Sequence, residues 1–318
     1  MMLRIFTSVF AVAPLALLEA ADPNLLNLLM PDAKVVAGVN AAQAKTSTFG
    51  QYVITQIQAN DPNFQKFVTQ TGFDPTQDLD ELLVGSNGAT TAPSHLVVAS
   101  GRFNESQIDA AAKQDGATSE VYKGITITEK QNGGFAFLST TLALAGDIAS
   151  VKGAIDRQNN TATMLNSTLL GMVTQLRTTE DAWGVSEVPP PAFKPPAGAP
   201  NLPNVPSTVL QNVQQASGGV KFGTLVAINA QLVADTAPNA TALANILQFL
   251  VNLGQMQAQQ NPKAAAALQS VQVSTSNNTV TVSGTIPEAD LEALVQSKNA
   301  QAAPSARRPQ GQRQGQRF

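Results

Sequence analysis

The feature that most constrains this sequence is a long segment that occurs twice. Residues 94–113, SHLVVASGRFNESQIDAAAK, resemble residues 278–297, NTVTVSGTIPEADLEALVQS. In both stretches an alternating β-branched run precedes a glycine and then an apolar pattern at helical spacing, which predicts a strand, a turn and a helix. Unrelated stretches of ordinary composition would share roughly one residue over this length. The identities are offset by 183 residues and are Val97 with Val280, Ser100 with Ser283, Gly101 with Gly284, Glu105 with Glu288 and Ala110 with Ala293.

The similarity continues upstream at an offset of 189 residues. Residues 36–41, VAGVNA, align with residues 225–230, LVAINA, and residues 79–86 align with residues 268–275. A loop six residues shorter in the second copy (189 − 183) accounts for both offsets, and surface loops tolerate such deletions. Copies this long predict duplicated units rather than an array of short repeats.

The first copy predicts strands and helices in the order β-α-β-β-α-β. Strands are expected at 32–40, 82–86, 96–102 and 120–129, with the main helices at 46–59 and 104–114. This order is the split β-α-β pattern, with an extra hairpin attached. We therefore predict an α+β fold of two duplicated ferredoxin-like (split β-α-β) units with mostly antiparallel sheets, the first repeat at 22–160 and the second at 220–298.

The residues between the two units, 161–219, are predicted to form a connector. It contains a strand at 181–188, a proline-rich loop at 189–206, which cannot form a helix or the interior of a sheet, and a short helix at 207–216. Because the second copy ends one strand early, we expect 181–188 to supply its missing strand. An unpaired edge there would invite aggregation.

The N-terminal residues have the pattern of a secretory signal peptide. A short region with Arg4 precedes the apolar run 5–18, and the small residues Ala20 and Ala21 follow. The run is shorter than the roughly 20 residues that a membrane-spanning helix needs. We predict a signal peptide at 1–21, export to the periplasm or the extracellular space, and no transmembrane anchor after cleavage.

The C-terminal residues 299–318 form a basic tail that we expect to be disordered. It is rich in Gln and Gly and lacks large apolar residues before its last position. A basic end on an acidic body can bind an anionic polymer or surface, so the tail is the candidate element for such a partner. An extension without any partner is the alternative. No specific nucleic-acid motif is present. The tail's basic residues are Arg307, Arg308, Arg313 and Arg317.

The residue content excludes several kinds of chemistry. The chain has no cysteine, which excludes disulfides, thiolate metal sites and cysteine nucleophiles. His95 is the only histidine, so a site with several histidine ligands is excluded, and we expect His95 to be a surface residue beside a hairpin. We assign no catalytic, cofactor-binding or metal-binding residue and expect no cofactor.

The densest acidic group is the one candidate for a reactive site. Asp74, Asp78, Asp80 and Glu81 lie close in sequence, and the alternate spacing from Asp74 resembles a calcium loop. The glycine at the sixth position of such a loop and the glutamate at its twelfth are missing, since the twelfth residue is Gly85. We expect these acids to cap helices, with Asp74 as N-cap, rather than to bind calcium. A hydrolase that uses two of them as paired carboxylates is the alternative.

Two further features have an ordinary structural interpretation. Trp183, the sole tryptophan, is expected in a core rather than in a ligand platform. The glycine pairs at 133–134 and 218–219 lack the context of a phosphate-binding or dinucleotide-binding loop, so we interpret both as turns.

Three phrases, PDAKVVAGVN, GFDPTQDLDELL and DAW, resemble those of uncharacterised exported bacterial proteins of the domain-of-unknown-function type. The resemblance covers about the first half of the chain and contains no catalytic motif, so it implies export and no particular activity. Together with the absence of grouped reactive side chains, it favours an exported, non-enzymatic protein that acts by binding or scaffolding a partner that the sequence does not identify. A secreted hydrolase that uses the carboxylates of residues 74–81 is the alternative.

Overall fold

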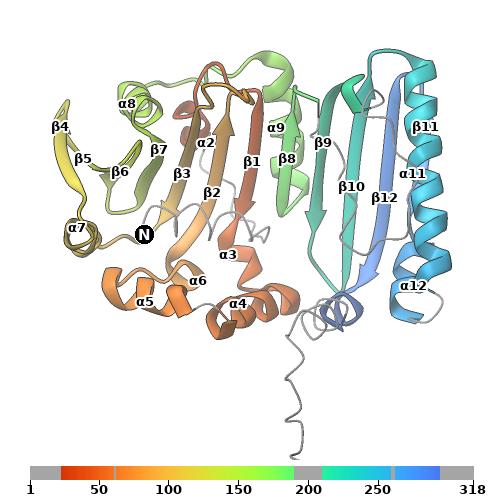
Figure 1. Ribbon diagram of the computed structural model, residues 1–318, viewed down its shortest axis with the longest axis horizontal. Coiled ribbons are helices and arrows are strands. Elements are labelled where there is room, and N and C mark those ends of the chain that lie inside the picture. The colour runs from red at the N-terminus through yellow and green to blue at the C-terminus, as the bar shows by residue number, and fades with distance from the viewer. Residues whose placement is uncertain (1–22, 61, 190–209, 259–261, 294–318) are drawn as a thin grey trace, which may run out of the picture.

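The computed structural model describes residues 23–60, 62–189, 210–258 and 262–293 (Figure 1). The predicted signal peptide at 1–21, nearly all of the proline-rich loop at 189–206 and the basic tail at 299–318 lie outside these residues. Among the described helices, none combines the length and apolar character needed to cross a membrane.

The first half of the chain follows the predicted elements closely, because its alternating runs and helix caps are strong local signals. Asn104 caps its helix by accepting a hydrogen bond from the Gln107 backbone, and Asp147 caps another through Ser150. The elements are α2 (Pro23–Asn27), β1 (Val35–Asn40), α3 (Ala41–Ala44), α4 (Thr48–Asn60), α5 (Pro62–Thr71), α6 (Pro75–Asp78), β2 (Leu79–Ser86), β3 (His95–Gly101), α7 (Glu105–Gln114), β4 (Thr118–Tyr122), β5 (Ile125–Lys130), β6 (Gly133–Ser139), β7 (Leu142–Asp147) and α8 (Ile148–Arg157).

The remaining elements differ more from the prediction. Residues 207–216 were expected to be helical, but 213–216 belong to strand β9. In the first half, 120–129 was expected to be one strand and is divided between β4 and β5. The elements are α9 (Ser167–Thr179), β8 (Ala182–Ser186), β9 (Val213–Lys221), β10 (Leu225–Ala234), α11 (Ala237–Gln257), α12 (Pro262–Gln269), β11 (Gln272–Ser276) and β12 (Thr279–Pro287).

All twelve described strands form one open antiparallel sheet, which confirms the α+β class. Its order is β11-β12-β10-β9-β8-β1-β2-β3-β7-β6-β5-β4, so β11 and β4 are the two edges. Figure 1 shows β4 at the left end of the molecule and β11 at the right end. Because β8 pairs with both β1 and β9, a five-residue strand joins the two halves.

The structure does not show two duplicated ferredoxin-like units. The predicted superposition fails in strand order, because Val84 lies between β1 and β3 whereas its counterpart Val273 lies on edge strand β11. The cause is the connection that follows the first strand of each copy. Four short helices return the chain to β2 at the end where β1 stops, whereas the 21-residue α11, about 30 Å long, carries it back along the sheet. As a result β11 runs parallel to β10 with β12 between them, a split β-α-β order, whereas β1 and β2 are direct antiparallel neighbours.

The strand at 181–188 does not take the predicted place. The position beside β10 belongs to β9, and β8 lies one strand further on, between β9 and β1. The glycine pairs are not turns either, since Gly218 and Gly219 lie inside β9 and Gly133 and Gly134 begin β6.

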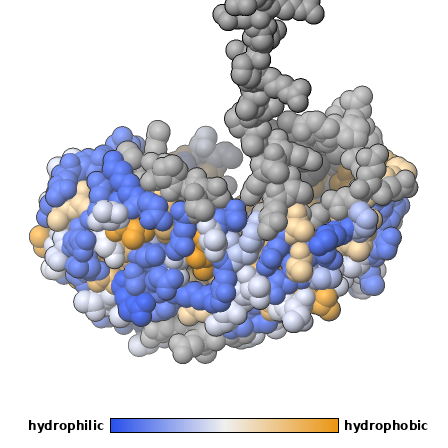
Figure 2. Space-filling model, turned by 90° about the horizontal axis from the view of Figure 1, so that it is seen from below, coloured by the Kyte–Doolittle hydropathy of each residue, from blue (hydrophilic) through white to orange (hydrophobic). Residues whose placement is uncertain are grey.

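The two faces of the sheet are covered by different helices. On one face, the α9 face, α2, α8 and α9 pack over the first half in a core that includes Leu29, Leu83, Ile155 and Trp183. On the other, the α11 face, α3, α5 and α7 cover the first half in a core rich in phenylalanine, and α11 covers β10 and β12. Seen from the end where α4, α5 and α6 lie, the described surface is mostly hydrophilic with scattered apolar residues (Figure 2).

Candidate functional site

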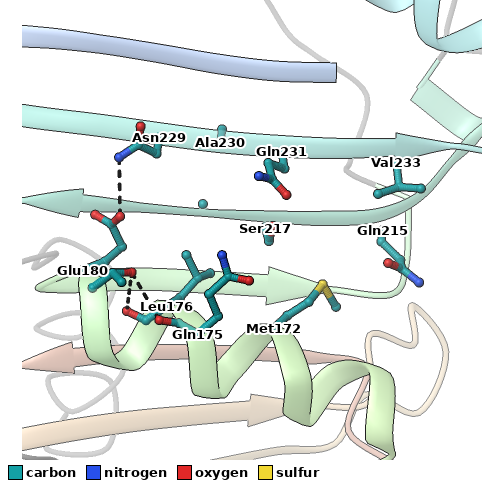
Figure 3. A pocket seen from close by; sticks show the side chains of 12 residues that line it. Met172, Gln175, Leu176, Glu180, Gln215, Ser217, Asn229, Ala230, Gln231 and Val233 are labelled. Carbon is teal, nitrogen blue, oxygen red and sulfur yellow. Dashed lines mark hydrogen bonds between the residues drawn. The ribbon is translucent and has the colours of Figure 1, made fainter. Parts of the chain in front are cut away.

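A groove of about 190 Å³ lies on the α9 face, where the C-terminal turns of α9 form a wall above β9 and β10 (Figure 3). No described helix packs over β10 on this face, so the groove is open on the side away from α9. Its lining residues are Met172, Gln175, Leu176, Thr179, Glu180, Gln215, Ser217, Gly218, Asn229, Ala230, Gln231 and Val233.

A row of directly opposed residues crosses four strands and ends at Asn229, which lines the groove. Gly38 of β1 faces Trp183 of β8, Trp183 faces Gly219 of β9, and Gly219 faces Asn229 of β10. The two glycines are required by close approach. A Cβ at residue 38 would lie 2.3 Å from the indole of Trp183, and one at residue 219 would lie 2.4 Å from Cγ of Glu180.

Gly219 therefore allows the Glu180 side chain to lie flat on the sheet. Glu180 follows α9 directly, and its backbone N–H donates to the carbonyl of Leu176 at 2.8 Å. Its Oε1 accepts a hydrogen bond from Nδ2 of Asn229 at 3.4 Å, while the buried Oε2 has no hydrogen-bond partner. The carboxyl group is thus fixed at the end of the groove with one oxygen unsatisfied.

The environment of Glu180 favours its protonated form. Burial raises the pKa of the Glu180 carboxyl above its ordinary value, and the nearby charge of Asp181 acts in the same direction. The hydrogen bond from Asn229 and the charge of Lys221 lower the pKa but only partly offset the rise.

The neighbouring carboxylate of Asp181 does not enter the groove. Asp181 is fully buried, forms an ion pair with Nζ of Lys221, and accepts a hydrogen bond from the Phe222 backbone at 2.7 Å. Glu180 is consequently the only carboxyl group among the described residues that line the groove.

The rest of the lining is uncharged. Amides of Gln175, Gln215, Asn229 and Gln231 and hydroxyls of Thr179 and Ser217 supply donors and acceptors, and the part of the lining that the structure describes contains no lysine or arginine. Small apolar surfaces complete the wall and floor. Such a lining suits an uncharged polar ligand, because a ligand anion would be desolvated there without a cation among the described lining residues to pair with it.

The comparisons with known proteins concern the fold. No protein-family model and no curated protein sequence matches the chain. The fold resembles that of TP0453. Crystal form III of this Treponema protein matches with a TM-score of 0.54 and 12% identity over 87% of this chain and 98% of the other. Crystal form I of TP0453 gives a TM-score of 0.51 at 10% identity, over 88% and 99% of the two chains. At these identities the likeness to TP0453 extends to the fold alone.

The acidic group predicted from the sequence lies away from the groove. Asp74 caps α6 by accepting a hydrogen bond from Thr76, and Asp78 accepts one from the Asp74 backbone. Asp80 lies 4.0 Å from Lys45, and Glu81 lies 3.4 Å from Arg177 in a buried ion pair. Within the described residues, no three potential metal ligands come together at these or other positions.

The other residues considered from sequence occupy structural positions. His95 is exposed at the start of β3, and its backbone N–H donates to Asp147. Trp183 is buried against Gly38, in the core on the α9 face. Sequence reasoning missed Glu180, Asn229 and the glutamines of the groove. Gly219 is the one local signal of the groove in the sequence. It identifies the groove only once its position opposite residues of β8 and β10 is known.

Proposed function

We propose that the protein is an exported, non-enzymatic binding protein whose groove on the α9 face takes an uncharged ligand with hydroxyl or amide groups. The observation that carries this proposal is the pairing of an uncharged amide and hydroxyl lining with a single desolvated carboxyl group. Ligand pockets typically fix orientation with a few polar groups on an apolar base.

The placement of the carboxyl groups favours binding over hydrolysis. A glycosidase needs two carboxyl groups that face each other across a substrate. In the groove Glu180 stands alone, since Asp181 is held by Lys221, and the acids of residues 74–81 cap a helix or form ion pairs elsewhere. The alternative of a secreted hydrolase therefore lacks a supporting pair among the described residues.

Titration calorimetry with neutral sugars tests the groove. N-acetylglucosamine and glucose serve as uncharged probes, and glucuronate serves as an anionic probe of similar size. We expect a neutral probe to bind more tightly than glucuronate. Replacing Gln231 or Gln215 with alanine should weaken binding about three- to tenfold, since one hydrogen bond contributes about 0.5–1.5 kcal/mol.

The matched control is Gln114→Ala, which removes an exposed amide of α7 remote from the groove. Equal affinities of Gln231→Ala, Gln215→Ala and Gln114→Ala would reject the groove as the site. Preference for glucuronate would reject the proposed ligand chemistry.

Export is part of the proposal and has its own test. The core begins at Leu25, so removal of residues 1–21 would leave every described core residue in place. Mass spectrometry of the protein from the periplasmic and extracellular fractions should give a chain that starts near Asp22. A full-length chain confined to the cytosol would contradict export.

A further inference from the structure

The two edges of the sheet differ in how they are protected. Edge strand β4 carries Glu120, which pairs with Lys152, and the adjoining Lys123 lies 2.5 Å from Asp156. Charged side chains at an edge discourage pairing with another strand. Edge strand β11, with the sequence QVSTS, has no charge and no proline. Of the strands that the structure describes, β12 is its single neighbour.

The helix beside β11 is also unprotected. α11 contains no charged residue over its 21 positions and packs against β11 and β12. Figure 1 shows it along the same end of the molecule as β11. Phe249 and Met256, seven residues apart on one side of the helix, are 46% and 61% exposed. Exposed large apolar side chains next to an uncharged open edge are features of an interaction surface.

We propose that β11 and α11 form the interface of a symmetric homodimer, in which β11 pairs antiparallel with β11 of a second copy and the two sheets become continuous. A two-fold interface brings one surface against itself, so it requires a surface that does not repel its own copy. An uncharged strand and an uncharged helix meet this condition. The β4 edge would instead bring Glu120 and Lys123, with their ion-pair partners on α8, against their own copies.

The register follows from the hairpin. Two residues, Asn277 and Asn278, connect β11 to β12, and Ser276 faces Thr279 as the closing pair. In such a ladder alternate residues direct their backbone groups toward the partner strand, so Val273 and Thr275 direct theirs outward. With Ser274 on the two-fold axis, Val273 of each copy lies opposite Thr275 of the other. Their outward N–H and C=O groups are then satisfied.

The same arrangement places the two α11 helices on one face of the continuous sheet, because the two-fold axis is perpendicular to the sheet. α11 spans β11, β12 and β10 of its own copy, so the two helices flank the new strand pair.

Cross-linking gives a direct test, because the chain has no cysteine of its own. Ser274→Cys places one thiol opposite its copy across the axis. Opposed residues in a non-hydrogen-bonded pair have Cα atoms about 4.5 Å apart, within the about 4.4–6.8 Å that a disulfide spans. We expect Ser274→Cys to form a covalent dimer on mild oxidation, whereas Thr118→Cys on the exposed β4 edge should remain monomeric.

A second experiment measures dimer formation by the protein without a cysteine substitution. Light scattering after gel filtration of the full chain should give the mass of a dimer that dissociates on dilution. Ser274→Lys, which opposes two like charges at the axis, should shift it to the monomer, and Thr118→Lys should leave it unchanged. A monomer at every concentration, or equal cross-linking at positions 274 and 118, would overturn the proposal. This outcome would not affect the sugar-binding test of the groove.

Discussion

Gly38→Ala is the substitution that most directly tests how the two halves are joined. The added methyl group would lie 2.3, 2.4 and 2.7 Å from Cζ2, Cε2 and Nε1 of Trp183, where non-bonded carbon atoms prefer about 3.5–4.0 Å. Trp183 is only 6% exposed, so the indole cannot move aside without displacing core residues around it. Overpacking of this kind costs about 1–3 kcal/mol.

Packing against Trp183 and intrinsic strand propensity predict opposite signs for the change in stability. Alanine is otherwise more favourable than glycine inside a strand, because glycine loses more conformational entropy on folding. Gly171→Ala in α9 provides the matched control, since nothing lies within 4 Å of its added Cβ. It should stabilise the protein by about 0.5–1 kcal/mol.

Urea unfolding followed by circular dichroism measures both changes, and the emission of Trp183 reports on its surroundings. In a Trp183→Leu background the cost of Gly38→Ala should fall, with a coupling energy of about 0.5–3 kcal/mol. If Gly38→Ala is as stable as the unchanged protein and its tryptophan emission is the same, the packing argument is refuted.

Three further predictions concern buried or capping polar groups. Because the pKa of Glu180 is raised, the folded state holds its proton to higher pH than the unfolded state, so unfolding free energy should fall as pH rises above about 4.5. Glu180→Gln should remove that part of the slope between pH 4.5 and 7.5 in urea titrations, and parallel curves for the two proteins would contradict it. Asp181→Asn should destabilise the protein by about 2–3 kcal/mol at neutral pH, because a fully buried carboxylate that pairs with Lys221 and the Phe222 backbone is lost; a change below about 0.5 kcal/mol in the same assay would count against this. The side chain of Asn166 caps α9 by accepting a hydrogen bond from the Leu169 backbone at 2.9 Å. Asn166→Ala removes this cap and should lower the free energy of unfolding by about 1 kcal/mol. Unchanged thermal unfolding of Asn166→Ala would show that the cap contributes nothing.

The parts of the fold that the sequence predicts are those whose signals are local. The hairpin of β11 and β12 follows from alternation on both sides of Asn277 and Asn278, and α7 follows from the cap at Asn104. Strand order does not follow, because it depends on where a connection ends. The similar strands of the two copies occupy different places for this reason.

The groove is hidden in the sequence for the same reason. Gly218 and Gly219 resemble a turn, yet they continue a strand because Glu180 lies over residue 219 and fills the space that a side chain would occupy. The raised pKa of Glu180 comes first from the burial that the assembled sheet provides and then from the charge of Asp181. Neither relation is visible in the residues next to the glycines.

The position of β8 has a consequence for the order of assembly. Strand β1 ends at Asn40 and its second neighbour begins at Ala182, 142 residues later (182 − 40). At roughly 5–20 residues per second of synthesis, one side of β1 lacks its partner for roughly 7–28 s. During that interval the nascent first half presents an unpaired strand and the empty space over Gly38. The arrival of Trp183 fills the space over Gly38 and gives β1 its second neighbour, and the unpaired edge then passes to β8 until β9 is made.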